Sequence, residues 1–266
     1  MFRSPTHFLI WIAAAGVLTF LVAPIVIVVI ASFNDSQILS FPLERFSMRW
    51  YEALVADVAL IEAFHVSIIV AAVATLLSIL IGIAAAFAIN RYDFRGRDLV
   101  SVFLLSPLMI PLIVLGLAVL LVIAALGARP TLASFVWMHV LITVPYVVRT
   151  VLATLVRFDI TLEEVALSLG ANDFRVKIHV TLPLIRPGII AGGFFAFMTS
   201  FDNVPISIFL GSARMTTLPV KIYSQIEAYG LDPVFAAISS VIIVLTLVIM
   251  LLLDRYVGLD YLRSDS

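Results

Sequence analysis

The sequence predicts an all-α membrane protein with six transmembrane helices. Of its 266 residues, 63% are hydrophobic and only 12% are charged, and the mean hydropathy is +1.18. Soluble domains have about 45–50% apolar and about 25% charged residues. A helix needs about 20 apolar residues to cross the hydrocarbon core of a bilayer, and the chain contains six apolar runs long enough to do so.

The six runs are bounded by charged or turn residues. They cover residues 8–33, 62–90, 99–126, 132–155, 188–210 and 231–253. Arg3 precedes the first run, as in a signal peptide. However, this run is longer than the roughly 7–15 residues of a signal hydrophobic region, and no clear small-x-small cleavage site follows it. We therefore expect an uncleaved first span and a single transmembrane domain over residues 1–266.

Composition also excludes several kinds of site. The chain has no cysteine, so disulfides, thiolate metal sites and cysteine nucleophiles are excluded. The four histidines lie far apart in the sequence and show no metal-ligand spacing, so no metal site is predicted. A net charge of -1 and a pI near 6.4 give no basis for nucleic-acid binding, which requires a clustered basic face.

Positive charge predicts the orientation of the spans, because short cytoplasmic loops retain Lys and Arg. With the N-terminus inside, eleven basic residues fall on the inner side and five on the outer side. The inner set is Arg3, Arg91, Arg95, Arg97, Arg149, Arg157, Arg175, Lys177, Arg186, Arg255 and Arg263, and the outer set is Arg45, Arg49, Arg129, Arg214 and Lys221. Both termini are therefore predicted to be cytoplasmic.

The connection over residues 34–61 mixes aromatic and charged side chains. This pattern is typical of a short interfacial helix on the outer membrane surface, beginning at Met48 with Ser47 as its N-cap. A loop that packs over the helix bundle would show the same composition, so both interpretations stay open.

Two prolines interrupt the third run, at Pro107 and Pro111. Proline removes a helix hydrogen bond, so a kink is expected there. Broken spans are frequent where a transporter lines its pathway. A kink that only improves helix packing explains the same residues.

Residues 157–187 form the longest polar segment between apolar runs, and the charge distribution places it in the cytoplasm. Residues 162–169 have helical periodicity, with two acids in the first turn that suit the helix dipole. Gly170 supplies the left-handed position that ends a helix, and Asn172 begins a second helix. This second helix is expected to stop before Leu182 and Pro183, with Pro187 opening the fifth span. An amphipathic helix lying on the inner leaflet would instead require a basic polar face.

This segment resembles the EAA loop of binding-protein-dependent ABC importer permeases. The loop has the pattern Glu-Ala-Ala, a Gly six residues after the Glu, and Ile or Val-x-Leu-Pro further on. The matching positions are Glu164, Val165, Ala166, Gly170, Val180, Leu182 and Pro183. Pro187 matches a proline that usually follows just beyond the pattern, and Val165 replaces the first Ala. The resemblance implies the type I importer fold and a loop that inserts into a cleft on a separate ATPase subunit. The coupling residues it implies are Glu163, Glu164, Ala166, Gly170, Ala171, Asn172, Leu182 and Pro183.

Asp202 lies inside the fifth apolar run. An ionisable residue within a span is costly unless it faces water or a partner, so Asp202 is a candidate for contact with a cationic solute. Pro205 lacks an N–H, so nearby backbone carbonyls are left free to accept hydrogen bonds from other polar groups. The alternative is a structural role in which Asp202 pairs with Asn203, Arg149 or His139.

The region around Asp202 is similar to the spermidine and putrescine type of these permeases. That type has a Ser-Phe-Asp-Asp segment before a Thr-Thr-Leu-Pro-Val-x-Ile-Tyr stretch. Residues 200–203 here read Ser-Phe-Asp-Asn, and residues 216–223 follow the second pattern. Asn203 removes one negative charge, so an opine, an amino-acid-like solute or another amine stays open as an alternative to a polyamine. The candidate pathway residues are Asp202, Asn203, Ser200, Phe201, Pro107 and Pro111.

The resemblance implies a transport subunit of a bacterial inner (plasma) membrane that imports a small organic cation. No Gly-x-x-x-x-Gly-Lys-Ser/Thr occurs in the chain, so ATP and Mg²⁺ are expected to be used by a partner and no cofactor is expected on this chain. The implied partners are an ABC ATPase dimer, a second permease subunit, a periplasmic or extracellular solute-binding protein and membrane lipid. A secondary carrier or channel that works without an ATPase is one alternative. An intramembrane enzyme is another, but His-Glu-x-x-His and Gly-x-Ser-x-Gly are absent from the sequence.

Overall fold

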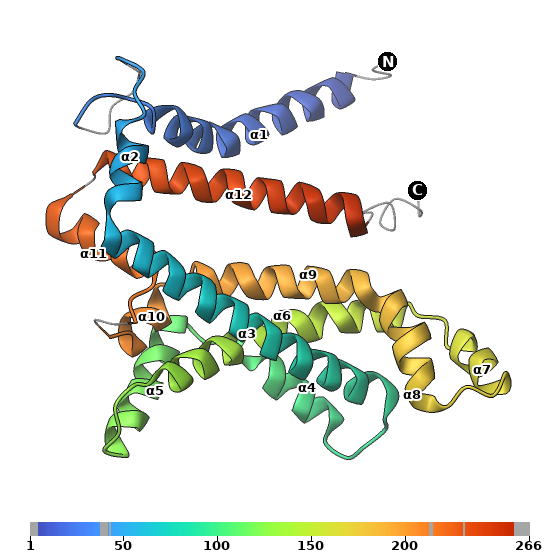
Figure 1. The fold of residues 1–266 in the computed structure, drawn as a ribbon. Helices are drawn as coiled ribbons and strands as arrows, with labels where there is room; N and C mark the ends of the chain where they lie inside the picture. Colours follow the sequence, from blue (N-terminus) through green and yellow to red (C-terminus); the bar gives the residue numbers. More distant parts are fainter. Residues whose placement is uncertain (1–4, 38–41, 43, 213–214, 231, 258–266) are drawn as a thin grey trace. The chain divides into compact units, whose positions relative to one another are not determined.

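The computed structural model describes residues 5–37, 42, 44–212, 215–230 and 232–257, and its regular elements are helices (Figure 1). Within these ranges the only strand-like pairing is an isolated antiparallel bridge between Asn34 and Phe46. The chain forms two compact units, residues 1–61 with 224–254 and residues 62–223 with 255–266. Arg3, Arg214 and Arg263, which contribute to the predicted orientation, lie outside the described residues, as does the predicted start of the sixth span at residue 231.

Unit 1 contains two long apolar helices, α1 (Pro5–Ala31) and most of α12 (Pro233–Val257), and the short helix α2 (Arg49–Ala56). A helix over residues 49–56 agrees with the helical interpretation of the connection after the first span. It begins one residue later than the sequence predicts, so Met48 rather than Ser47 is its N-cap.

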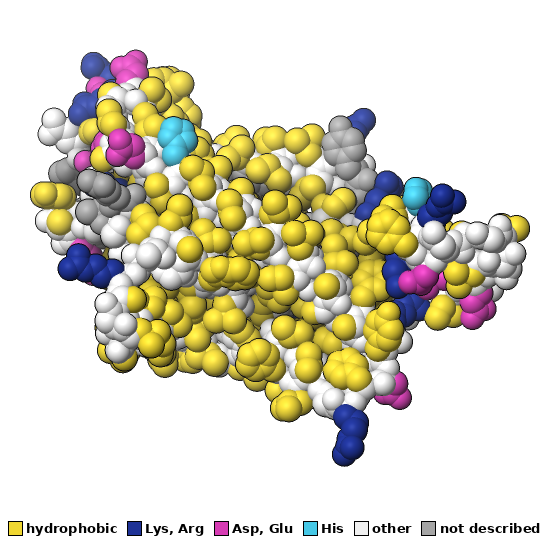
Figure 2. Space-filling view, turned by 60° about the horizontal axis from the view of Figure 1, so that its bottom comes forward, with side chains coloured by type: hydrophobic (Ala, Val, Ile, Leu, Met, Phe, Trp, Pro, Cys, Tyr) yellow, Lys and Arg dark blue, Asp and Glu magenta, His cyan; other side chains and the backbone are white. Residues whose placement is uncertain are grey.

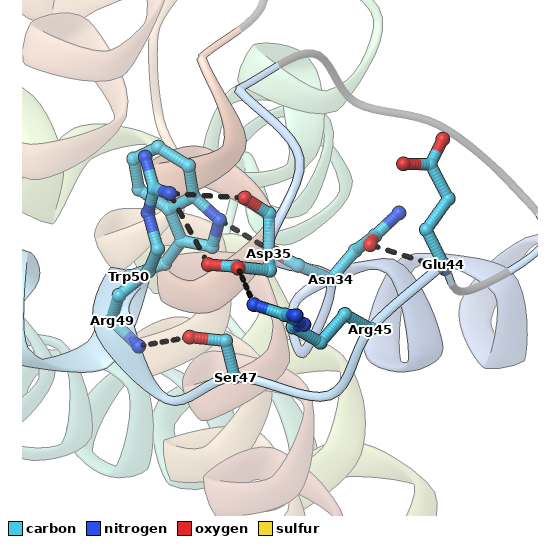
Figure 3. Close-up of polar contacts among 7 residues, drawn as sticks. All are labelled: Asn34, Asp35, Glu44, Arg45, Ser47, Arg49 and Trp50. Atoms are coloured by element: carbon cyan, nitrogen blue, oxygen red, sulfur yellow. Dashed lines mark hydrogen bonds and ion pairs between the residues drawn. The ribbon is translucent and has the colours of Figure 1, made fainter.

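A network of polar contacts holds the chain between α1 and α2 (Figure 3). The Arg49 guanidinium donates to the backbone oxygen of Asp35 at 3.0 Å and to its carboxylate at 3.2 Å. The same guanidinium lies 4.2 Å from the ring centroid of Trp50, and Trp50 Nε1 donates to the backbone oxygen of Asn34 at 2.7 Å. The Ser47 hydroxyl accepts from the Arg49 N–H at 3.2 Å. Arg49, counted among the outer basic residues, is therefore paired within its own unit.

Unit 2 holds the remaining elements. In chain order they are most of α3 (Val58–Arg91), α4 (Arg97–Leu105), the 3₁₀ turn η1 (Ser106–Leu108), α5 (Leu112–Ala125), α6 (Leu132–Val156), α7 (Thr161–Ser168), α8 (Asp173–Val176), the π segment η2 (Lys177–Thr181), α9 (Leu182–Phe201), α10 (Pro205–Leu210) and the first half of α11 (Leu218–Tyr229). Figure 2 shows hydrophobic side chains over the long helices of this unit, and charged side chains gathered around α7 and α8.

Five helical segments in the described residues are long and apolar enough to cross a membrane. They are residues 8–31, 58–91, 132–156, 173–201 and 233–253. A sixth is present if α4 with η1 and α5 count as one span, which is bent by 102°. The bend falls between Pro107 and Pro111, the two prolines at which the sequence predicts a kink.

Helix α6 forms the core of unit 2, and α9 packs along it through two glycines one helical turn apart. A Cβ on Gly188 would lie 2.7 Å from the backbone oxygen of Thr150, and a Cβ on Gly192 would lie 2.9 Å from the Cα of Val147. Both distances are shorter than a real Cβ contact, so only glycine permits this approach of the two backbones. Small residues four apart are typical of close helix packing in membranes.

The broken third and fifth spans pack against each other through their second halves, α5 and α10. A Cβ on Gly116 of α5 would lie 3.2 Å from the Cα of Ile206 and 3.3 Å from the backbone oxygen of Pro205. Ile206 is fully buried in a cluster with Phe135 of α6. The two breaks therefore belong to one packed region.

The predicted stop before Leu182 is wrong, because the helical path continues from α8 through η2 into α9. Pro183 lies in the first turn of α9, directly after the π segment, and Pro187 lies inside the helix. The π segment immediately before them widens the turn and provides the local adjustment that helix prolines require. The fifth span is also divided differently than expected: α9 ends at Phe201 and α10 begins at Pro205.

Candidate functional site

Helix α7 is a short rigid element with defined ends. At its start, the Asp159 carboxylate accepts from the Thr161 N–H at 3.0 Å, and hydrogen bonds from Thr161 hold the pKa of Asp159 below its usual range. At its end, Gly170 has φ +90°. The Gly170 N–H donates to the Leu167 oxygen, and the Ala171 N–H donates to the Ala166 oxygen at 3.1 Å. These two bonds form a Schellman motif, which requires the left-handed residue that glycine supplies.

The chain restarts as a helix at Asn172, as the sequence predicts. The Asn172 side-chain oxygen accepts from the Arg175 N–H at 2.8 Å, which caps α8. One turn later, Lys177 Nζ lies 2.5 Å from the Asp173 carboxylate. Residues 161–176 are thus a helix, a sharp bend and a second helix. Backbone hydrogen bonds close the end of α7, and a side-chain hydrogen bond caps the start of α8.

The structure separates the two neighbouring acids of α7. Glu163 is largely buried: its carboxylate accepts from Arg91 Nη2 at 2.9 Å and from the Thr181 hydroxyl at 2.5 Å. Glu164 is exposed, and within the described chain its carboxylate has no partner. Val165 and Leu169 beside it are 52% and 83% exposed. The outer face of α7 therefore presents a free carboxylate among apolar side chains.

A second candidate region is the break between α9 and α10. Asp202 follows the last residue of α9 and is exposed, and its carboxylate makes no hydrogen bond or ion pair with any described residue. Asn203 is buried, and its side-chain oxygen accepts from the Ile206 N–H at 3.0 Å, which caps α10. The pairing of Asp202 with Asn203, Arg149 or His139 considered from the sequence is not formed.

His139 instead joins the two sides of this break. Its Nδ1 lies 2.8 Å from the Ser200 hydroxyl of α9, and its Nε2 lies 3.3 Å from the Ser207 hydroxyl of α10. The His139 side chain is fully buried, and the Phe135 ring lies edge-on at 4.8 Å. Ser200 is therefore part of a buried polar cluster. Among residues 200–203, only Asp202 is charged.

The other candidate pathway residues, Phe201, Pro107 and Pro111, have different surroundings from Asp202. Phe201 is nearly buried and contacts the rings of Phe64 and Phe197. Pro107 is buried in η1, beside a small apolar pocket of about 220 Å³ lined mainly by α4 and α6, whereas Pro111 is exposed at the start of α5. No group of three potential metal ligands occurs among the described residues.

The sequence does not predict that Arg91 and Thr181 bind Glu163, or that His139 joins α9 to α10. Arg91 and Glu163 are 72 positions apart, so no local pattern connects them. For His139, a signal was present: a histidine in a membrane span usually faces the bundle interior and has a polar partner.

Replacing His139 with alanine is expected to destabilise unit 2. The change leaves the buried hydroxyls of Ser200 and Ser207 without their partner, at a cost of about 1–3 kcal/mol in the free energy of unfolding. Thermal unfolding of the purified protein in detergent measures this as a lower transition temperature. The triple variant H139A/S200A/S207A removes the stranded hydroxyls and should recover part of the loss; equal transition temperatures for H139A and the wild type would contradict the prediction.

A family model described as the binding-protein-dependent transport system inner membrane component matches residues 78–258, which is more than half of the sequence. The chain belongs to this family. It is accordingly an inner-membrane permease with the helical importer fold that the EAA resemblance implies.

Relatives of this permease family align over nearly the whole chain. The spermidine/putrescine transport system permease protein PotC of Escherichia coli (strain K12) is 33% identical over 251 residues, 94% of each chain. The putrescine transport system permease protein PotI of the same strain is 33% identical over 248 residues, 91% of this chain and 86% of PotI.

Solved structures agree with the family's fold. A bacterial ABC transporter involved in the import of the acidic polysaccharide alginate has a chain that matches 97% of this permease and 98% of its own length, with a TM-score of 0.70 and 15% identity. The MetNI methionine ABC transporter has a chain with a TM-score of 0.59 and 18% identity, over 80% of this permease and 98% of its own length. At these identities the likeness concerns the fold alone.

Proposed function

We propose that this permease is one transmembrane subunit of an ATP-driven importer for a small organic cation, a polyamine such as putrescine or spermidine. An external binding protein delivers the solute, a second permease subunit completes the pathway, and an ABC ATPase dimer supplies the driving force. The identity to PotC and PotI over almost the full chain carries this proposal. Both termini and the α7–α8 segment face the cytoplasm, in accordance with the distribution of Lys and Arg.

The geometry of the α7–α8 segment supports its role as the contact with the ATPase. A coupling element has to be rigid and has to present an uncovered face to a groove. Helix α7 is closed by a Schellman motif at Gly170, and Asn172 caps the next helix. Glu164, Val165 and Leu169 are exposed on it. These residues form the docking face, with Leu182 and Pro183 at the start of the span that receives the motion.

The free carboxylate of Asp202 supports a cationic cargo. It is the one charged group at the break between α9 and α10, and no described residue neutralises it. A carboxylate in a partly desolvated pathway attracts an ammonium group more strongly than it does in bulk water. Asn203 caps α10 and supplies no second charge, so recognition of the amine at this break depends on Asp202.

The test is ATP-dependent uptake of radiolabelled putrescine and spermidine into liposomes that contain the complete assembly with its binding protein. Uptake that requires both ATP and the binding protein is expected. If the binding protein binds neither amine, or if the permease alone carries them without the ATPase, the proposal fails and the alternative of another solute or a secondary carrier is favoured.

Replacing Asp202 with asparagine is expected to reduce the transport efficiency for putrescine, measured as kcat/KM, about tenfold, which corresponds to about 1.4 kcal/mol of lost attraction. The matched control is D98N, which removes an exposed carboxylate from the first turn of α4. D98N should transport as the wild type does. Unchanged uptake kinetics in D202N would show that Asp202 does not act on the solute.

A further inference from the structure

A salt bridge links α7 to the end of α3. A groove of about 520 Å³ lies between the end of α3 and the α8–η2 segment, and Arg91, Glu163 and Phe174 are among the residues that line it. At this groove, Arg91 of α3 reaches Glu163 of α7. The groove is lined by both apolar and charged side chains, and the Arg91–Glu163 pair joins α3 to α7 there.

The contacts of Glu163 join three segments at one carboxylate oxygen. Arg91 Nη2 donates to Oε1 from the end of α3, and the Thr181 hydroxyl donates to the same oxygen from η2. The Arg91 guanidinium also lies 5.2 Å from the ring centroid of Phe158, in the connection between α6 and α7. Thr181 is fully buried, and the Arg91 and Glu163 side chains are only 18% and 17% exposed. A charged pair shielded in this way is screened little by solvent and holds its geometry better than a surface pair.

From this geometry we infer that Glu163 is a positioning residue of the transport cycle: with Arg91 and Thr181 it forms a strut that holds α7 rigidly to α3 and η2. The inference rests on the proposed function, because it assigns the strut the task of carrying ATPase-driven motion of α7 into the spans. The inference gives Glu163 and Glu164 different roles. Glu164 faces the ATPase, whereas Glu163 faces inward and does not touch the ATPase.

Thr181 adds a reason why the strut acts on the spans. It is the last residue of the π segment, directly before α9, and α9 leads without interruption to the break at Asp202. A displacement of α7 transmitted through Glu163 thus reaches both α3 and the helix that ends at the proposed solute contact. Without the strut, α7 could move relative to α3 and η2 while both spans stay in place.

Spin labels test the strut directly. The chain has no cysteine, so L167C in α7 and L76C in α3 place two unique labels at exposed positions within unit 2. In the assembled complex, the wild-type background should give one narrow distance distribution with and without nucleotide. E163Q and T181V should broaden it, because each removes one arm of the strut. T181S retains the hydroxyl and should restore the narrow distribution. T181V also serves as the milder variant if E163Q fails to assemble.

Two further measurements distinguish the strut from other roles. In E163Q, the putrescine carried per ATP hydrolysed should fall about tenfold, within the range of typical coupling between sites, while the ATPase still co-purifies with the permease. Loss of the ATPase from purified E163Q complexes would show direct contact and overturn the inference. Identical label distances in E163Q and the wild type would overturn it as well. The label distances need no solute, so a wild-type complex that carries no putrescine would refute the proposed cargo and leave this test intact.

Discussion

Replacing Gly188 with leucine is expected to prevent unit 2 from folding stably in the membrane. The Cβ alone would lie 2.5 Å from the Thr154 hydroxyl and 2.7 Å from the backbone oxygen of Thr150, and a leucine adds three further carbons at the same place. The backbone of α6 cannot move away locally, because Val147 and Val151 of this helix are fully buried. The α6–α9 seam would have to open along its length.

Replacing Gly188 with alanine tests the same contact with a smaller side chain. Overpacking of a close contact costs about 1–3 kcal/mol, so G188A should lower the thermal transition of the purified protein, and G188L should abolish a monodisperse folded species in size-exclusion chromatography. The matched control is G16A in α1, where a Cβ would have nothing within 4 Å. G16A should not lower the transition. A transition temperature for G188A equal to that of the wild type would show that α6 and α9 do not approach as closely as described.

The sequence predicts those parts of this molecule that depend on local chemistry. Spans follow from the length of apolar runs, and the sharp bend of the third span follows from two prolines, because neither requires knowledge of distant residues. The bend between α7 and α8 is of the same kind. Gly170 and Asn172 specify a helix end and a helix start, and both form as expected.

What the sequence does not predict depends on contacts between distant segments. Helical periodicity places Glu163 and Glu164 next to each other on α7, but it cannot tell which of them meets Arg91 of another helix. The spacing of Gly188 and Gly192 is visible in the sequence, whereas its partner surface on α6 is not. The sequence does not predict the uninterrupted helical path through Pro183, because a π segment, which has no clear sequence signature, accommodates the proline.

Reversing the charge of Glu164 is expected to abolish coupled transport while leaving the permease folded. The substitution E164K places a positive charge in the first turn of α7, where the helix dipole makes it unfavourable by about 0.3–1 kcal/mol. This cost is too small to unfold α7, whose ends are held by the Asp159 and Gly170 contacts. At a docked interface, by contrast, disruption of a buried charge contact costs about 2–5 kcal/mol. ATP-driven putrescine uptake should therefore fall about 100-fold or more.

The variant E52K is a matched control for this prediction. Glu52 is also an exposed acid in the first turn of an eight-residue helix, α2, so its reversal changes the helix dipole interaction and the net charge in the same way. E52K should retain ATP-driven uptake and co-purify with the ATPase, whereas E164K should lose the ATPase or its stimulation by the loaded binding protein. Wild-type uptake by E164K would mean that the outer face of α7 is not the docking surface. The comparison with E163Q is informative in the same assay: loss of the ATPase in E164K and its retention in E163Q would show that two adjacent carboxylates on one helix divide docking and transmission between them.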